Sequence, residues 1–147
     1  MHKSTKEKMR RRKYRAKLTG LAHIGVCVSN MDRSVAFYQD VLGLALEKRF
    51  TMANGSELAF LRVGDCTIEL ICRPGGNVPS APGQVDHICF DVCDIEPLVE
   101  RLRVQGVSFL SESVATMQGG LAGIKNIFLT GPDGERIEFF DQSGAKA

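Results

Sequence analysis

The sequence predicts an α+β fold in which two tandem βαβββ modules form a curved mixed sheet around a cleft, with the helices outside. A repeat within the chain supports this prediction. The segments Leu21–Asp32 and Val85–Glu96 both combine an apolar strand pattern with the start of a helix, and each strand contains one histidine, His23 or His87. Each segment is followed by further strand patterns, one of which carries a single glutamate. The repeat therefore indicates that the chain contains two copies of one βαβββ module.

The first module is expected at residues 18–75. Its first strand is predicted over Leu21–Ser29, and Ser29 or Asn30 is expected to cap the following helix, because a short polar side chain accepts hydrogen bonds from the free N–H groups. Gly43 is expected to end this helix, since glycine tolerates the left-handed conformation found there. Three strands are predicted next: Leu44–Phe50, Leu58–Val63 and Thr67–Cys72.

A linker is predicted at residues 76–84, around which three of the five prolines of the chain gather. The second module is expected at residues 85–142, and a short tail follows at residues 143–147. Asp94 is predicted to cap its helix, which runs to about Gln105. The predicted strands of this module are His87–Val92, Val107–Leu110, Ile124–Thr130 and Arg136–Asp141.

The segment from Met117 to Gly123 is rich in glycine and lacks periodicity. It is therefore predicted to be a loop, either a plain surface loop or one that closes over a ligand. Met117, Gly119 and Gly120 are its candidate substrate-binding positions. A tight turn is predicted at Gly131-Pro-Asp-Gly, because these residue types favour turn conformations.

The length of 147 residues and the hydrophobic content of 44% fit one domain or two small fused modules. No apolar run approaches the roughly 20 residues needed to cross a bilayer, and no apolar signal-peptide core follows the basic N-terminus. The five cysteines are odd in number and form no C-x-x-C pair, which favours a reducing compartment. A cytoplasmic protein without a membrane partner is expected.

Charge is unevenly distributed along the chain. The predicted N-terminal tail, residues 1–17, contains nine Lys or Arg and one acid, whereas the remaining chain contains ten basic and sixteen acidic residues, a net charge of −6. A basic tail is able to bind nucleic acid or an anionic surface, but a solvated extension is the simpler interpretation. Because the body is acidic, nucleic acid is not expected as the main partner.

The two strand glutamates, Glu69 and Glu138, are expected to face the cleft. Side chains alternate between the two faces of a strand, and each glutamate is flanked by two large apolar residues. The apolar pair belongs beneath the helix, so the glutamate points to the opposite, concave face. His23 and His87 occupy matching places in the first strand of each module, which predicts four polar groups in one cleft.

Two imidazoles and two carboxylates form a candidate metal site, because a buried carboxylate needs a partner and a divalent cation serves two at once. This donor set suits one divalent ion such as Zn, Ni, Co, Mn or Fe(II), rather than Ca. A lone strand histidine or glutamate is more often structural or solvated. The metal prediction therefore depends on the recurrence of all four residues across the repeat: His23, Glu69, His87 and Glu138.

Four strings carry a family resemblance: Ala22-His-Ile-Gly-Val, Ser34-Val-Ala-Phe-Tyr-Gln-Asp-Val-Leu-Gly-Leu, Asp86-His-Ile-Cys-Phe-Asp-Val and Gly131-Pro-Asp-Gly-Glu-Arg-Ile-Glu-Phe. They resemble the vicinal oxygen chelate superfamily of glyoxalases, bleomycin resistance proteins and dioxygenases, and are closest to glyoxalase I-like proteins (lactoylglutathione lyases). The resemblance covers residues 19–142. It implies a divalent metal ion, a small-molecule substrate and a homodimer, with the ligands drawn from one subunit or from two.

The order His23, Glu69, His87, Glu138 resembles the ligand order of the shorter bacterial glyoxalase I. This implies a lyase or isomerase that moves a proton next to a metal-bound carbonyl or enediolate oxygen, with Glu138 as the base. Methylmalonyl-CoA epimerases are similar, and extradiol dioxygenases of this fold hold Fe(II) with two His and one Glu. These two activities remain alternatives, as does a drug- or metabolite-binding protein without catalysis, although such proteins typically lack the metal ligands.

One position departs from glyoxalase I. Four residues after the first ligand, that family commonly has an arginine for the glutathione carboxylate, and this chain has Cys27. A thiol cannot supply a planar cation, so the identity of the substrate is not determined by the resemblance. Arg62, Arg73 and Lys125 are the cations that could take the place of the expected arginine. Cys27 and Cys89 are predicted to line the cleft as small residues, with ligation of a soft metal as the alternative.

Overall fold

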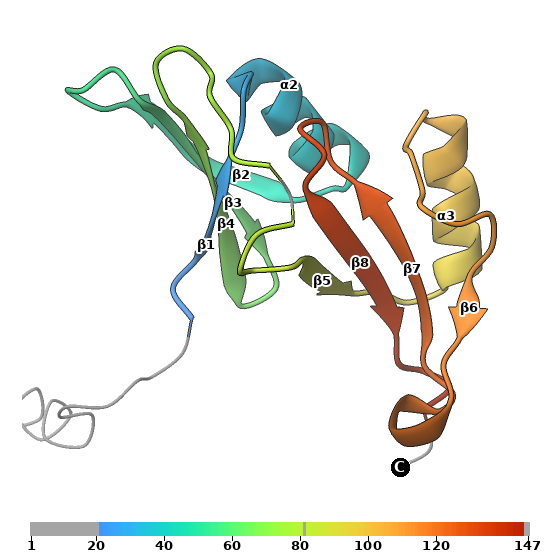
Figure 1. The fold of residues 1–147 in the computed structure, drawn as a ribbon. Helices are drawn as coiled ribbons and strands as arrows, with labels where there is room; N and C mark the ends of the chain where they lie inside the picture. The colour runs from blue at the N-terminus through green and yellow to red at the C-terminus, as the bar shows by residue number, and fades with distance from the viewer. Residues whose placement is uncertain (1–20, 81, 146–147) are drawn as a thin grey trace, which may run out of the picture.

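The structure is a computed structural model that describes residues 21–80 and 82–145 (Figure 1). The predicted basic tail, residues 1–17, lies outside the described residues. The first module contains β1 (Ile24–Cys27), α2 (Met31–Val35), the π-helical turn η1 (Ala36–Val41), β2 (Ala45–Thr51), β3 (Glu57–Val63) and β4 (Cys66–Cys72). The second module contains β5 (Ile88–Asp91), α3 (Ile95–Val104), β6 (Ala115–Thr116), the 3-10 turn η2 (Gly119–Leu121), β7 (Lys125–Thr130) and β8 (Arg136–Asp141). The predicted α+β fold of tandem βαβββ modules is confirmed.

The two modules have the same sheet topology. The strand order is β1-β4-β3-β2 in the first sheet and β5-β8-β7-β6 in the second. In each sheet the first strand runs parallel to the last, and the other neighbours are antiparallel. Each module therefore contributes one four-stranded mixed sheet, with β1 and β5 at the outer edges.

Alternation along the strands separates a helix-covered face from a polar face in both modules. Ile68 and Leu70 of β4 are buried on the side of α2, and Ile137 and Phe139 of β8 are buried on the side of α3. Burial of each such side chain contributes about 1.5–3 kcal/mol to folding. The glutamates between these residues therefore lie on the opposite face of each sheet.

The turn between β7 and β8 joins the second module to the first, and Figure 1 shows it reaching towards α2. The backbone N–H and the hydroxyl of Ser29 donate to the Asp133 carboxylate, and the Arg33 guanidinium donates to it at 2.9 Å. The buried Tyr38 hydroxyl donates to Glu135 at 3.0 Å. The predicted tight turn is present, with the Gly134 N–H donating to the Gly131 carbonyl. These polar contacts therefore tie the β7–β8 turn to the first module.

The two helix caps differ. Asn30 caps α2 as predicted, since its Oδ1 accepts from the Arg33 N–H at 3.0 Å. Asp94 precedes α3, but its side chain makes no capping hydrogen bond, and the prediction was wrong in this respect. Its backbone is left-handed (φ 53°), whereas an N-cap residue that uses its side chain as an acceptor is normally extended. Asp141 of β8 caps α3 instead, because its Oδ2 accepts from the Ile95 N–H at 3.2 Å.

The predicted strand Val107–Leu110 was also wrong, because this segment forms only an isolated bridge between Phe109 and Leu129. The Arg103 guanidinium of α3 donates to the carbonyls of Ser111 and Glu112 and lies 4.9 Å from the Phe109 ring centre. These contacts hold the segment against α3. The short strand β6 takes the outer place in the sheet. The predicted loop from Met117 to Gly123 contains η2, and its ends are joined by a hydrogen bond from the Gly123 N–H to the Met117 carbonyl.

All five cysteines are free. Three are half-buried, and Cys89 and Cys93 are exposed. Among the described residues, no helix has the length and apolar content to cross a membrane.

Candidate metal centre

The first module pairs His23 with Glu69. The two side chains approach to 2.8 Å between Nε2 of the imidazole and Oε2 of the carboxylate. The pairing follows from the parallel register of β1 and β4, in which Gly25 lies opposite Glu69 and His23 stands two residues earlier on the same face. Gly25 has no side chain, which leaves the carboxylate free to reach the imidazole.

The second module pairs His87 with Glu138 in the same way. Here Nε2 of the imidazole lies 3.2 Å from Oε1 of the carboxylate, and Cys89 lies opposite Glu138 in the parallel register of β5 and β8. Glu138 is the more deeply buried of the two glutamates, with 7% of its side chain exposed against 14% for Glu69. Its Oε2 accepts a hydrogen bond from the Asn126 amide at 2.9 Å.

A phenylalanine flanks each histidine, and the sequence interpretation missed both. Phe60 lies opposite Glu69 in the ladder, with its ring edge-on to His23 at 5.8 Å between ring centres. Phe128 lies opposite Glu138 and is edge-on to His87 at 5.3 Å. The available signal was the Phe-Leu dipeptide, which occurs in the middle strand of both copies. We refer to His23, Phe60 and Glu69 as the first half-site, and to His87, Asn126, Phe128 and Glu138 as the second half-site.

The structure brings the four predicted ligands together as two pairs, not as one group. Within residues 21–80 and 82–145, no three His, Cys, Asp or Glu side chains are grouped closely enough to hold an ion. The donors in each half-site are of the right chemistry for a divalent cation of the Zn, Ni or Fe(II) kind, with a nitrogen and a carboxylate oxygen facing one another. One chain therefore offers two donors in each of two places.

The second half-site has a further layer of polar contacts. Nδ1 of His87 lies 2.6 Å from the Asp86 carboxylate, which also accepts from the Arg136 guanidinium at 3.1 Å. The hydrogen bond with His87, together with the charge of Arg136, holds the pKa of Asp86 below its ordinary value. In the first half-site Ala22 stands in the place of Asp86, so the two half-sites differ on this side.

Arg73, which follows directly after β4, lies next to Cys27 at the end of β1. Its guanidinium is 2.9 Å from the Cys27 sulfur. Of the three cations that the sequence offered, this one lies beside the position where a substrate-binding arginine was expected. Arg62 forms an ion pair with Glu47, and Lys125 forms one with Glu96.

The thiol of Cys89 shares the polar face with Glu138. Although the residue as a whole is exposed, the neighbouring protein atoms partly remove its thiol from water, and this effect, followed by the charge of the Glu138 carboxylate, raises the pKa of Cys89 to about 12. The thiol is therefore protonated at neutral pH in the metal-free protein.

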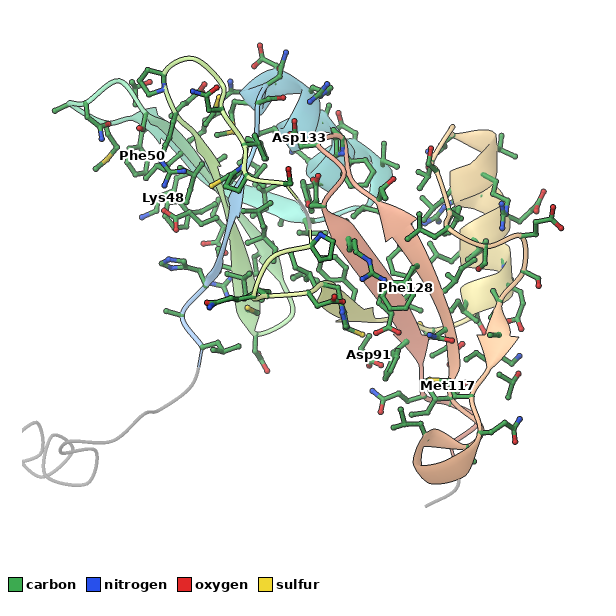
Figure 2. All side chains as sticks on the ribbon, in the orientation of Figure 1. Lys48, Phe50, Asp91, Met117, Phe128 and Asp133 are labelled. Atoms are coloured by element: carbon green, nitrogen blue, oxygen red, sulfur yellow. The ribbon has the colours of Figure 1, made fainter. Side chains whose placement is uncertain are left out.

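The side chains that surround the half-sites belong to different strands. On the first sheet, Phe50 stacks against Phe60 at 6.2 Å between ring centres, and the Lys48 ammonium lies 5.3 Å from the Phe60 ring centre. Figure 2 shows Lys48 and Phe50 together on the first module, whereas Phe128 and Met117 belong to the second. Substrate contacts of Met117, Gly119 and Gly120 stay a prediction.

A cavity of about 250 Å³ lies between the two modules. Its walls include Ile24 and Cys27 of the first module, Val78 of the linker, and Asp86 and Arg136 of the second module. It therefore connects the Cys27 end of β1 with the polar contacts around His87.

Comparison with known proteins gives a consistent family assignment. Residues 20–139 match the pattern of the Glyoxalase/Bleomycin resistance protein/Dioxygenase superfamily. The chain is 36% identical over 124 residues to the uncharacterized protein YwbC of Bacillus subtilis, with 82% of this chain and 95% of that protein covered. It is 33% identical over 134 residues to the lactoylglutathione lyase of Haemophilus influenzae, with 86% and 96% covered.

More distant similarities agree with this assignment. The human mitochondrial methylmalonyl-CoA epimerase is 28% identical over 102 residues, which cover 64% of this chain and 58% of that protein. Among solved structures, a glyoxalase family protein from Enterococcus faecalis superposes with a TM-score of 0.70 at 21% identity, covering 84% of this chain and 98% of that one. This structural likeness speaks for the fold alone.

Proposed function

The chain belongs to the Glyoxalase/Bleomycin resistance protein/Dioxygenase superfamily, and from this premise we propose that it is a metal-dependent lyase or isomerase. The reaction would move a proton on the carbon next to a carbonyl or enediolate oxygen of a small-molecule substrate, and a bound ion would supply the polarisation of that oxygen. The observation that carries the proposal is the pair of His–Glu contacts, His23 with Glu69 and His87 with Glu138, which occur in the same strand register of both modules. Non-catalytic binding proteins do not need this repetition.

A complete metal site requires both half-sites, and one chain holds them apart. We therefore propose a homodimer in which the first half-site of one subunit faces the second half-site of its partner. The outer edges of β1 and β5 support this arrangement, because edge strands offer unpaired backbone groups to a second chain. The four ligands then hold one divalent ion, with Ni, Zn, Co, Mn and Fe(II) as candidates.

Glu138 is the proposed base. A bound ion would polarise the substrate oxygen and so acidify the neighbouring C–H bond. Glu138 is nearly buried, and the Asn126 amide holds its Oε2, which leaves Oε1 to accept the proton and return it to the adjacent carbon or to the other face. Phe60 and Phe128 each cover one edge of a histidine ring and so provide an apolar side to the two half-sites.

Arg73 is the proposed anchor for an anionic part of the substrate. It lies four positions after Glu69, directly beyond the end of β4, which corresponds to a separation of roughly 13 Å along an extended chain. Its guanidinium beside Cys27 supplies the cation that Cys27 itself cannot. This arrangement favours an elongated substrate that has its reacting carbon at one end and a carboxylate or phosphate at the other.

An epimerase that acts on an acyl thioester is the second candidate. The similarity to methylmalonyl-CoA epimerases favours it, and the chemistry is the same proton transfer at a carbon next to a carbonyl group. Both candidates use the same ligands and the same base, so substrate choice alone distinguishes them.

A metal-titrated activity panel tests the proposal. Protein purified without chelators is analysed for bound metal and then assayed with the hemithioacetal of methylglyoxal and glutathione, with methylmalonyl-CoA and with catechols. Proton transfer on either of the first two substrates that depends on added Ni, Zn, Co or Mn supports the proposal. Oxygen uptake with catechols and Fe(II) would assign a dioxygenase instead. A protein that binds no ion, and whose melting temperature does not rise with any of these metals, is not a metalloenzyme.

A further inference from the structure

We propose that Asp86 is a positioning residue for His87. Its carboxylate accepts a hydrogen bond from Nδ1–H of the imidazole, so that Nε2 carries the free electron pair towards Glu138. The contact distances are 2.6 Å between Nδ1 and Asp86 Oδ1, and 3.2 Å between Nε2 and Glu138 Oε1. The effect on metal affinity rests on the proposed function, whereas the orientation of the ring does not.

The tautomer follows from the two neighbours of the imidazole. Both Asp86 and Glu138 are acceptors, and a neutral imidazole has one N–H to donate. The Nδ1 contact is the shorter of the two, which assigns the proton to the Asp86 side. Nε2 and the Glu138 oxygen then face one another as two electron-pair donors, an arrangement that a cation between them satisfies.

Asp86 is itself held in place, although it is more than half exposed. Arg136 donates from one guanidinium nitrogen to both carboxylate oxygens at 3.1 Å, and its guanidinium lies 4.9 Å from the Phe128 ring centre. Phe128 in turn contacts the His87 ring edge-on. The four side chains form a closed ring of contacts, so Asp86 cannot turn away from His87 without giving up its bond to Arg136.

The first half-site lacks this support. Ala22 takes the place of Asp86, and the cation over Phe60 is Lys48, which has no carboxylate at that position to hold. The two copies of the repeat therefore differ at the residue that precedes the histidine. Of the two histidines, His87 is the one whose ring is fixed before a metal binds. His23 provides an internal reference within the same protein.

The tautomer can be measured directly by long-range ¹H–¹⁵N NMR on metal-free protein at a pH of about 9, where free imidazole is neutral. Wild-type His87 is expected in the Nδ1–H form. Asp86→Ala should release His87 from this form, and Asp86→Asn should retain it, because the amide oxygen still accepts from Nδ1–H. The His23 signals should stay unchanged in all variants. An Asp86→Ala protein whose His87 keeps the Nδ1–H form would overturn the proposal.

Zinc affinity, measured by competition with a chromophoric chelator, gives the second readout. Asp86→Ala should weaken Zn binding about 10- to 100-fold, the usual consequence of removing the hydrogen-bond partner of a metal-binding histidine. Asp91→Ala is the matched control, because Asp91 lies on β5 and bonds to Gln142 rather than to His87; its affinity should stay within twofold. If Asp86→Ala changes the His87 tautomer but wild-type protein binds no zinc, the positioning role is supported and the proposed metal-dependent function is overturned. Failure of the positioning role can therefore be distinguished from failure of the proposed function.

Discussion

The buried hydroxyl of Tyr38 donates a hydrogen bond to the Glu135 carboxylate at 3.0 Å and so joins the first module to the β7–β8 turn of the second. Burial and the nearby carboxylates of Glu135 and Asp133 raise the pKa of Tyr38 well above its ordinary value, which keeps the hydroxyl protonated as a donor. The other oxygen of Glu135 accepts from the backbone N–H of Asp133. Tyr38 is therefore expected to set the position of the turn.

Tyr38→Phe removes this donor and leaves a partly buried carboxylate oxygen without a partner. The free energy of unfolding should fall by about 1–3 kcal/mol, measured by urea denaturation. Glu135→Gln is the comparison: its amide oxygen still accepts from Tyr38, but its NH2 group cannot accept from the Asp133 N–H. Tyr38→Phe should therefore lower the stability of the Glu135→Gln protein as well. A Tyr38→Phe protein as stable as wild type would show that the hydrogen bond does not hold the modules together.

The cap of α3 should make stability depend on pH at the acidic end. Asp141 accepts from the side chain and backbone of Ser143 and from the Ile95 N–H, and these hydrogen bonds lower its pKa. A lowered pKa in the folded state means that the stabilisation is complete above the ordinary aspartate value of about 4 and is lost as the pH falls below it. Asp141→Asn should lower the melting temperature at pH 7, and the difference from wild type should shrink towards pH 3. Asp94→Asn is the control. A larger drop in melting temperature for Asp94→Asn than for Asp141→Asn would show that Asp94 caps the helix.

The strand pattern could be predicted because it depends on near neighbours. Ile68 and Leu70 flank Glu69 with a period of two, and burial of the two apolar side chains fixes the face of the glutamate. The repeat also predicts the register, since Gly25 and Cys89 hold equivalent places opposite the two glutamates. The His–Glu pairs within each module follow from these local rules.

The features that the sequence did not predict depend on contacts between distant residues. Asp141 caps a helix that begins 46 residues earlier in the chain, so no local signal distinguishes it from Asp94. Arg73 reaches Cys27 because β1 and β4 are neighbours, although the two residues are 46 positions apart. The placement of one module against the other likewise depends on Tyr38 and Glu135, 97 positions apart.

Mixed dimers test whether the metal site lies between subunits. His23→Ala and His87→Ala should each lose the metal, because each removes a ligand from every site. If each site combines the first half-site of one subunit with the second of its partner, a mixed dimer of the two variants has one intact site and one site that lacks both histidines. Random pairing makes half of the dimers mixed, so metal content and activity should return to about one quarter of the wild-type level.

The two variants are mixed by co-expression with different affinity tags, and mixed dimers are isolated before metal analysis, so that their metal content should rise from about one quarter in the mixture to about one half of the wild-type level. His23→Ala protein carried through the same procedure with both tags is the control and should contain no metal. If the isolated mixed dimer also stays metal-free, the four ligands do not form a site across the interface.

Arg73→Ala tests the anionic anchor. The substitution should raise KM for a substrate that carries a carboxylate roughly 13 Å from the reacting carbon. The loss of kcat/KM should be roughly 10- to 100-fold if a charged hydrogen bond of about 1.5–3 kcal/mol is removed. Arg101→Ala on the exposed face of α3 is the matched control for loss of a positive charge. Equal KM values for Arg73→Ala and wild type would exclude this residue from substrate binding.

Glu138→Gln separates metal binding from proton transfer. The amide keeps the size of the side chain and an oxygen towards the ion, but it cannot accept a proton from carbon. Metal content should therefore be retained, whereas exchange of the substrate C–H with solvent deuterium should fall by about 10²- to 10⁴-fold. Glu69→Gln is the comparison within the repeat, because Glu69 is a ligand without an assigned proton-transfer role, and it should retain more exchange at saturating metal. If the two variants lose exchange equally, the pair of glutamates shares the role of base; if Glu138→Gln retains full exchange, another residue performs it.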